Sequence, residues 1–250
     1  MKFLLFTTPR TGSKYLYSIL MPYMMAKYNA ASASEYFNFE ITNTLKTVDF
    51  SYNNTSDIDR LDLYNQELFG KLKNTNKFLF MKIFSMHVSS DVFNYLNDNY
   101  VFICLSRRNK LEQLLSFALS NKTLFWDVSN DNDVVKYNSK LSCYNLDKKY
   151  IVQGVREIKT YEFLLQYVKN IHTSLVYEDI IMQDPKELLI QLFPDDVDLI
   201  KSLTISLPIK QNSGDKFRYF SNRGEIISWF NNANVSPRIV DIANFGRLYH

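Results

Sequence analysis

Residues 7–14 combine the side chains and the local setting that an anion-binding turn needs. The segment reads Thr-Thr-Pro-Arg-Thr-Gly-Ser-Lys and separates an apolar run from a helical pattern. The first amide N–H groups of that helix therefore lie at the positive end of its dipole. Gly12 permits close approach of the backbone to a ligand. The side chains that add hydroxyl groups or positive charge are Arg10, Thr11, Ser13 and Lys14.

This turn differs from a Walker A loop. The Walker A pattern requires glycine where the chain has Thr7, and it places lysine before the hydroxyl residue, whereas the chain reads Ser13-Lys14. A bound nucleotide would therefore be held in another way. The alternative interpretation is an ordinary strand-turn-helix corner whose Arg10 and Lys14 face water.

A second group of candidate residues, Arg107, Arg108 and Ser116, follows a later apolar run. Asn109, a plausible helix cap, and Ser116 are seven positions apart, about 700° of helix rotation, so they share one face. Arg108 and Ser116 can therefore flank one anion beside the strand ends, where open parallel sheets bind ligands. A surface arginine and a solvated serine are the alternative.

The elements that must position these residues alternate between strand and helix patterns. Apolar runs typical of buried parallel strands occupy residues 2–8, 78–84 and 100–105, and residues 173–177 also read as a strand. Helical patterns begin at residues 13, 110, 155 and 185. This order predicts an α/β fold, a P-loop-like parallel sheet flanked by helices on both faces. We expect a single domain over residues 1–250, with irregular insertions at about 30–76 and 120–150.

Charge and composition narrow the class of ligand. The net charge is only +3, without a block of like charges, so we expect no nucleic-acid partner. Cys104 and Cys143 are too few and too unpatterned for a zinc site or a disulfide framework.

The apolar start of the chain stops too early for a signal peptide, and no run is long enough for a membrane span. We therefore expect a cytoplasmic protein.

Three ordered segments resemble one family of enzymes. Residues 8–13 resemble the 5′-phosphosulfate loop of sulfotransferases that use 3′-phosphoadenosine 5′-phosphosulfate (PAPS). The step from Arg108 to Ser116 resembles the spacing of the 3′-phosphate site in that family. Residues 175–185 are similar to its Tyr-Glu-Asp-Leu and Asp-Pro segment. Together the three matches are far more specific than any one of them.

Within this family, the chain is most similar to the bacterial carbohydrate sulfotransferases of the trehalose type. Glu35-Tyr36-Phe37 resembles the end of their Pro-x-Glu-Tyr-Phe motif, and residues 107–116, with Trp126 downstream, resemble their Arg-Arg-Asp-Lys-x-x-Gln-x-x-Ser motif. The resemblance implies transfer of a sulfuryl group from PAPS to a hydroxyl of a carbohydrate or glycolipid, with 3′-phosphoadenosine 5′-phosphate (PAP) as the product.

The resemblance also implies roles for individual residues. The residues that would hold the 5′-phosphosulfate are Arg10, Thr11, Gly12, Ser13 and Lys14. Arg108 and Ser116 would hold the 3′-phosphate, and Tyr177 or Trp126 would lie near the adenine. Lys210 and Lys216 occupy the place of a basic loop that closes over the 3′-phosphate in many sulfotransferases.

Sulfuryl transfer needs in-line positioning, charge neutralisation and a base for the acceptor hydroxyl, so we expect no metal. Glu35 is the first candidate for the base. His87 is the second, because eukaryotic cytosolic relatives place a Lys-x-His after a comparable strand, although here Lys82 and His87 are five positions apart. Lys82 itself can approach the bridging oxygen, or it can be merely solvated.

Two departures from the family pattern keep other functions open. Lys14 replaces a serine or threonine, and residues 30–34 replace the usual lead-in to Glu-Tyr-Phe. One alternative is an Mg²⁺-dependent P-loop kinase or NTPase. The other is a non-catalytic relative that binds PAP or PAPS. The identity of the acceptor and the oligomeric state stay open.

Overall fold

The computed structural model describes residues 1–35, 68–123, 131–208 and 215–237. This part of the chain contains a five-stranded sheet with the order β2-β3-β1-β4-β5, in which every pairing is parallel. The strands are β1 (Phe3–Thr7), β2 (Ala31–Ser34), β3 (Leu79–Phe84), β4 (Val101–Ser106) and β5 (Ile171–Val176). The predicted parallel α/β fold is confirmed.

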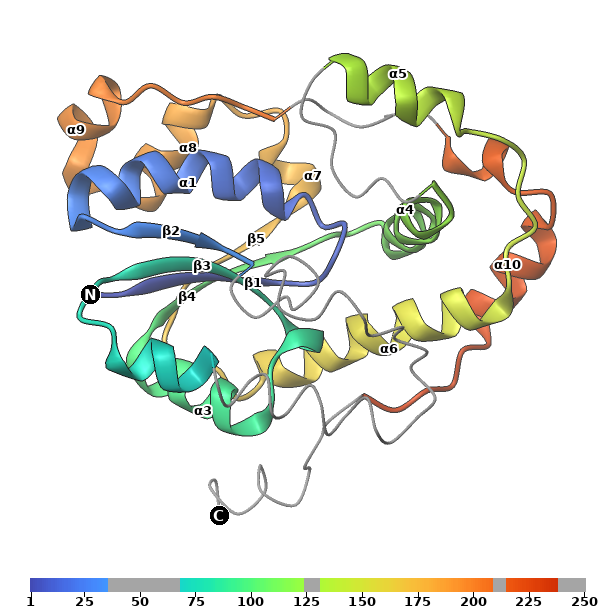
Figure 1. Cartoon of the computed structure of the whole chain (residues 1–250), viewed down its shortest axis with the longest axis horizontal. Helices are drawn as coiled ribbons and strands as arrows, with labels where there is room; N and C mark the ends of the chain where they lie inside the picture. The colour runs from blue at the N-terminus through green and yellow to red at the C-terminus, as the bar shows by residue number, and fades with distance from the viewer. Residues whose placement is uncertain (36–67, 124–130, 209–214, 238–250) are drawn as a thin grey trace.

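Helices cover both faces of this sheet (Figure 1). One face carries α1 (Ser13–Tyr28), α8 (Pro185–Leu192) and α9 (Val197–Ser202), and the other carries α3 (Ser90–Asn99) and α6 (Lys148–Leu165). The side chains of central strand β1 alternate between the faces: Phe3 and Leu5 pack with α1 and α8, whereas Leu4 and Phe6 pack with α3 and α6. Because both faces are covered, β1 has no polar face, and its uninterrupted apolar pattern follows.

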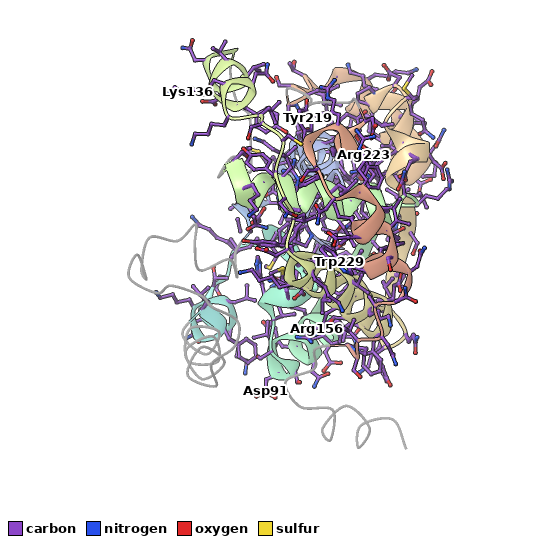
Figure 2. All side chains as sticks on the ribbon, turned by 90° about the vertical axis from the view of Figure 1, so that its right-hand side faces the viewer. Asp91, Lys136, Arg156, Tyr219, Arg223 and Trp229 are labelled. Carbon is purple, nitrogen blue, oxygen red and sulfur yellow. The ribbon has the colours of Figure 1, made fainter. Side chains whose placement is uncertain are left out.

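A third layer lies past the carboxyl ends of the strands. It consists of α4 (Lys110–Thr123), α6 and α10 (Arg223–Asn231), which share one apolar cluster. Helix α5 (Asp131–Ser139) lies beside this layer (Figure 1). Figure 2 looks onto this end of the molecule and shows Tyr219, Arg223 and Trp229 on the C-terminal segment and Arg156 on α6. Short helices complete the order: η1 (Ser85–His87), α7 (Tyr177–Ile180), η2 (Pro194–Asp196) and η3 (Lys216–Tyr219).

The stretches expected to be irregular contain regular elements where the structure describes them. Edge strand β2 and helical residues 68–74 fall within the first stretch, and α5 falls within the second. Strand β2 reads Ala-Ser-Ala-Ser, which has low strand propensity, so its extended form depends on pairing with β3. Across the described ranges, no helix is long and apolar enough to cross a membrane.

Candidate functional site

The carboxyl edge of the sheet brings the predicted site segments together. Each of the five parallel strands ends at this edge, and a candidate follows each end: Glu35 after β2, His87 after β3, residues 8–13 after β1, Arg107 and Arg108 after β4, and Tyr177 after β5. In open parallel sheets, ligands bind outside the carboxyl ends of the strands. The topology therefore places residues from distant parts of the sequence at one potential ligand site.

The turn between β1 and α1 has a left-handed backbone at two positions. Arg10 has φ 63° and Gly12 has φ 83°. A Cβ atom at position 12 would lie 2.1 Å from Cδ2 of Tyr177, so a side chain there would collide with that ring. Gly12 is also the residue that caps α1, and no side chain caps the helix end. The N-terminus of α1 is thus left without a side-chain cap, which is the setting in which an anion can bind a helix end.

Thr11, predicted as a hydroxyl ligand, directs its hydroxyl back into the turn. Its Oγ1 donates to the carbonyl of Thr8 at 2.8 Å and lies 2.6 Å from Oγ1 of Thr7. The Thr7 hydroxyl donates in turn to the carbonyl of Leu105 on β4 at 2.8 Å. Both threonines are fully buried, so their hydroxyl groups hold the shape of the turn. The other loop candidates are Ser13, which is buried, and Lys14, which is half-buried in the first turn of α1.

Arg10 connects the turn to α4. Its Nε donates to Oγ of Ser116 at 3.0 Å, and Ser116 is buried. The resemblance assigns these two residues to different phosphates of the nucleotide, and the structure makes them direct neighbours. A ligand that contacts both would have its two anionic groups on either side of this hydrogen bond.

The two adjacent arginines after β4 have different surroundings. Arg107 is 12% exposed: its Nη1 donates to the carbonyl of Arg10 at 3.2 Å, and its guanidinium carbon lies 5.2 Å from the centroid of the Tyr177 ring. Arg108 is 64% exposed and donates from Nη2 to both carboxylate oxygens of Asp179, at 2.7 and 2.9 Å. The sequence pattern singled out Arg108, but Arg107 is the arginine that contacts the β1–α1 turn.

Tyr177, the first residue of α7, lies close to both the β1–α1 turn and Arg107. Its ring lies against Gly12, and its centroid is 5.2 Å from the guanidinium carbon of Arg107. The resemblance implies a place near an adenine for this residue, whereas here the ring packs against Gly12 of the β1–α1 turn. Tyr177 therefore limits the space above the turn and fixes the need for glycine at position 12.

A third cation comes from the C-terminal segment. Lys216 of η3 is buried, and its Nζ lies 2.5 Å from Oε1 of Glu112, which also pairs with Arg107 at 3.2 Å. Burial lowers the pKa of Lys216; the pair with Glu112 opposes this shift, and the charges of Arg107 and Arg10 add to it. The carboxylates of Glu112 and Glu178 neutralise part of this positive charge. The other lysine of this segment, Lys210, lies outside the described residues.

Both candidates for the base lie in one buried cluster at the β2 and β3 ends. The carboxylate of Glu35 is 2.5 Å from Nζ of Lys82, and their side chains are 14% and 8% exposed. Burial lowers the pKa of His87 to about 4; the charge of Glu35 opposes this shift, and that of Lys82 adds to it. At neutral pH, His87 is therefore an uncharged neighbour of an ion pair.

Sequence reasoning gave no role to Gln113, although the quoted motif contains it. Its buried Nε2 donates to Oγ1 of Thr8 and to the carbonyl of Pro9, each at 2.8 Å. Gln113 and Ser116 lie three positions apart on α4, and Ser116 accepts from Arg10, the next residue of the same turn. The available signal was the i, i+3 spacing of two polar residues between the apolar residues of this helix.

Comparison with protein-family models gives no match for this chain, and a search of curated proteins gives none either. Its function is therefore inferred from the residues of the site and from the resemblance in residues 8–13, 107–116 and 175–185.

Proposed function

We propose that this protein is a PAPS-dependent sulfotransferase that acts on a hydroxyl of a carbohydrate or glycolipid. The observation that carries the proposal is the arrangement of two chemically different groups along one sheet edge. The β1–α1 turn, with Arg10 and Ser116, suits an anionic donor. The Glu35–Lys82 pair, at the ends of β2 and β3, suits the removal of a proton from an acceptor.

The donor is proposed to bind across the turn and α4. The start of α1, Arg10, Ser13 and Lys14 would hold the 5′-phosphosulfate through charge-assisted hydrogen bonds. Ser116 and Arg108 would hold the 3′-phosphate. Arg108 is available for this role because its pair with Asp179 is exposed, and such pairs contribute at most about 1 kcal/mol.

In the proposed reaction, the acceptor oxygen attacks the sulfur of PAPS. The bond from sulfur to the bridging oxygen of the 5′-phosphate breaks, and PAP leaves with the electron pair. Glu35 accepts the hydroxyl proton, and the charge of Lys82 stabilises the bridging oxygen as negative charge grows there. We assign the base to Glu35, because the resemblance gives this role to its position and because its carboxylate lies beside Lys82, the cation that would meet the bridging oxygen.

The test has a binding arm and a transfer arm. Calorimetric titration with PAP is compared with titration with adenosine 5′-phosphosulfate, which lacks the 3′-phosphate. Sulfur-35-labelled PAPS is then incubated with a panel of sugars and glycolipids. We expect micromolar binding of PAP and labelling of at least one carbohydrate acceptor. Failure of PAP to bind in this range contradicts the proposal.

The same measurements separate the alternatives. A non-catalytic relative, which the lysine at position 14 favours, would bind PAP without transferring label to any acceptor. An Mg²⁺-dependent kinase or NTPase would bind ATP more tightly when Mg²⁺ is added and would show no preference for PAP.

A further inference from the structure

Tyr17 of α1 joins the donor-binding helix to the edge of the sheet. Its ring stacks on Phe80 of β3, with centroids 5.1 Å apart and an angle of 13° between the rings. Its hydroxyl donates to the carbonyl of Phe80 at 3.0 Å and accepts from the backbone N–H of Ser34 at 3.0 Å. Oγ of Ser32 lies 2.9 Å from the same hydroxyl. Because the single hydroxyl hydrogen goes to Phe80, Ser32 is the donor in that contact.

The hydrogen bonds of Tyr17 act where β2 departs from regular pairing. The register of β2 against β3 shifts between Ser32 and Ser34. Ser34, the last residue of this edge strand, has φ 42°, a left-handed conformation that is unfavourable for a residue with a Cβ atom. Its N–H bonds to the hydroxyl of Tyr17, so a side chain of α1 holds this conformation in place.

The direction of the chain at Ser34 determines where Glu35 lies. Glu35 is the next residue, and its carboxylate meets Lys82 of β3 at 2.5 Å. Lys82 is two positions beyond Phe80, the other partner of Tyr17, on the same strand. One hydroxyl thus fixes both strands that supply the ion pair. Tyr17 also belongs to the helix that begins at the phosphate turn, so it links the two parts of the site through one rigid element.

We propose that Tyr17 is a positioning residue: its hydroxyl holds the end of β2 so that Glu35 keeps a fixed place relative to the donor turn. The inference rests on the proposed sulfotransferase function. Small displacements of a catalytic group reduce the rate strongly while leaving remote binding contacts intact. Tyr17 should therefore affect turnover much more than nucleotide affinity.

The test is the substitution Tyr17→Phe, which keeps the stacked ring and removes only the hydroxyl. We expect kcat to fall about tenfold or more, with the Kd for PAP unchanged within about twofold. Hydrogen exchange at the Ser34 N–H should become faster, because its acceptor is gone. Ser32→Ala, which removes one of the three hydrogen bonds, should give a smaller decrease in kcat.

Tyr23→Phe is the matched control. Tyr23 lies on the same helix, and its side chain is buried. Its hydroxyl donates to Oδ2 of Asp196 at 2.7 Å instead of to a residue of β2 or β3. This variant should lose comparable stability and keep the wild-type kcat. Wild-type kcat in Tyr17→Phe, or equal losses of kcat in the two variants, overturns the proposal.

The exchange measurement separates this inference from the function on which it rests. If the wild-type protein neither binds PAP nor transfers sulfate, the proposed function fails. Unchanged exchange at Ser34 in Tyr17→Phe overturns the positioning role even if the enzyme is active. If Tyr17→Phe does not fold, unchanged kcat and unchanged exchange in Ser32→Ala overturn it as well.

Discussion

At the scale of single residues, the β1–α1 turn depends on glycine at position 12. Gly12→Ala would place a Cβ atom 2.1 Å from the Tyr177 ring in a backbone with φ 83°. Overpacking and backbone strain should lower the free energy of unfolding by about 1–3 kcal/mol and weaken PAP binding at least about tenfold. Urea denaturation and PAP titration measure both effects. Gly224→Ala is the control, because open space surrounds that position, and it should leave both quantities nearly unchanged.

The two neighbouring arginines should respond differently to substitution. Arg108→Ala removes an exposed side chain, so stability should change by less than about 1 kcal/mol. Loss of a charged hydrogen bond should weaken PAP binding about tenfold and leave binding of adenosine 5′-phosphosulfate unchanged. Arg107→Ala should destabilise the fold by about 1–3 kcal/mol, because it removes the hydrogen bond to the carbonyl of Arg10, whereas Glu112 keeps its pair with Lys216.

Calorimetric titration of both nucleotides and denaturation of both variants measure this contrast. Equal weakening of the two nucleotides by Arg108→Ala would contradict a 3′-phosphate role for Arg108.

His87 should make stability depend on pH in the acid range. Burial lowers its pKa from the ordinary 6.5 to about 4, so the unfolded state binds more protons between these values. The contribution of neutral His87 to the free energy of unfolding is complete above pH 6.5. It declines as the pH falls toward 4, by about 3 kcal/mol in total. Denaturation at pH 7 and pH 4.5 should show a larger loss in the wild type than in His87→Gln. Parallel losses in the two proteins would refute this assignment.

At the scale of elements, α4 stabilises the β1–α1 turn through side-chain hydrogen bonds. Residues 113–120 of this helix are all buried. Gln113 and Ser116 lie one helical turn apart and contact Pro9 and Arg10 respectively. The turn therefore keeps its shape through contacts with a second helix, in addition to those made by β1 and β4.

Gln113→Met tests this support, because it keeps the length of the side chain and removes both hydrogen bonds to the turn. The free energy of unfolding should fall by about 1–3 kcal/mol, and PAP affinity should fall severalfold. Asn121→Met on the same helix is the control, since the described contact of its amide is the carbonyl of Phe117 within α4. Similar PAP affinities in the two variants would show that Gln113 does not hold the binding conformation.

At the scale of the whole molecule, the site is assembled by the order of the strands. The β1–α1 turn follows the central strand. Arg107 and Arg108 follow β4 on one side of it, and the Glu35–Lys82 pair lies at the ends of β2 and β3 on the other side. Apolar clusters on both faces and beyond the strand ends hold this arrangement. In the proposed function, PAPS at the end of β1 and the hydroxyl acceptor near the end of β2 would therefore lie side by side along this edge of the sheet.

Local sequence alone was enough to predict the three apolar strands β1, β3 and β4, the half-exposed strand β5, the start of α1, and the turn between β1 and α1. These features depend on neighbours within a few residues: apolar runs predict buried strands, and Asn109 caps α4, with its Oδ1 accepting from the N–H of Glu112 at 2.9 Å. Strand β2 was not predicted, because its alanines and serines form a strand only when β3 supplies the partner.

Which side chains contact one another depends on the packing of segments that are far apart in the sequence. Sequence spacing could not distinguish Arg107, whose side chain is 12% exposed, from Arg108, whose side chain is 64% exposed, because the two residues are adjacent. Glu35 and His87 looked like rival bases and proved to be neighbours around Lys82. Their proximity follows from parallel pairing, which aligns the ends of β2 and β3 whatever the length of chain between them.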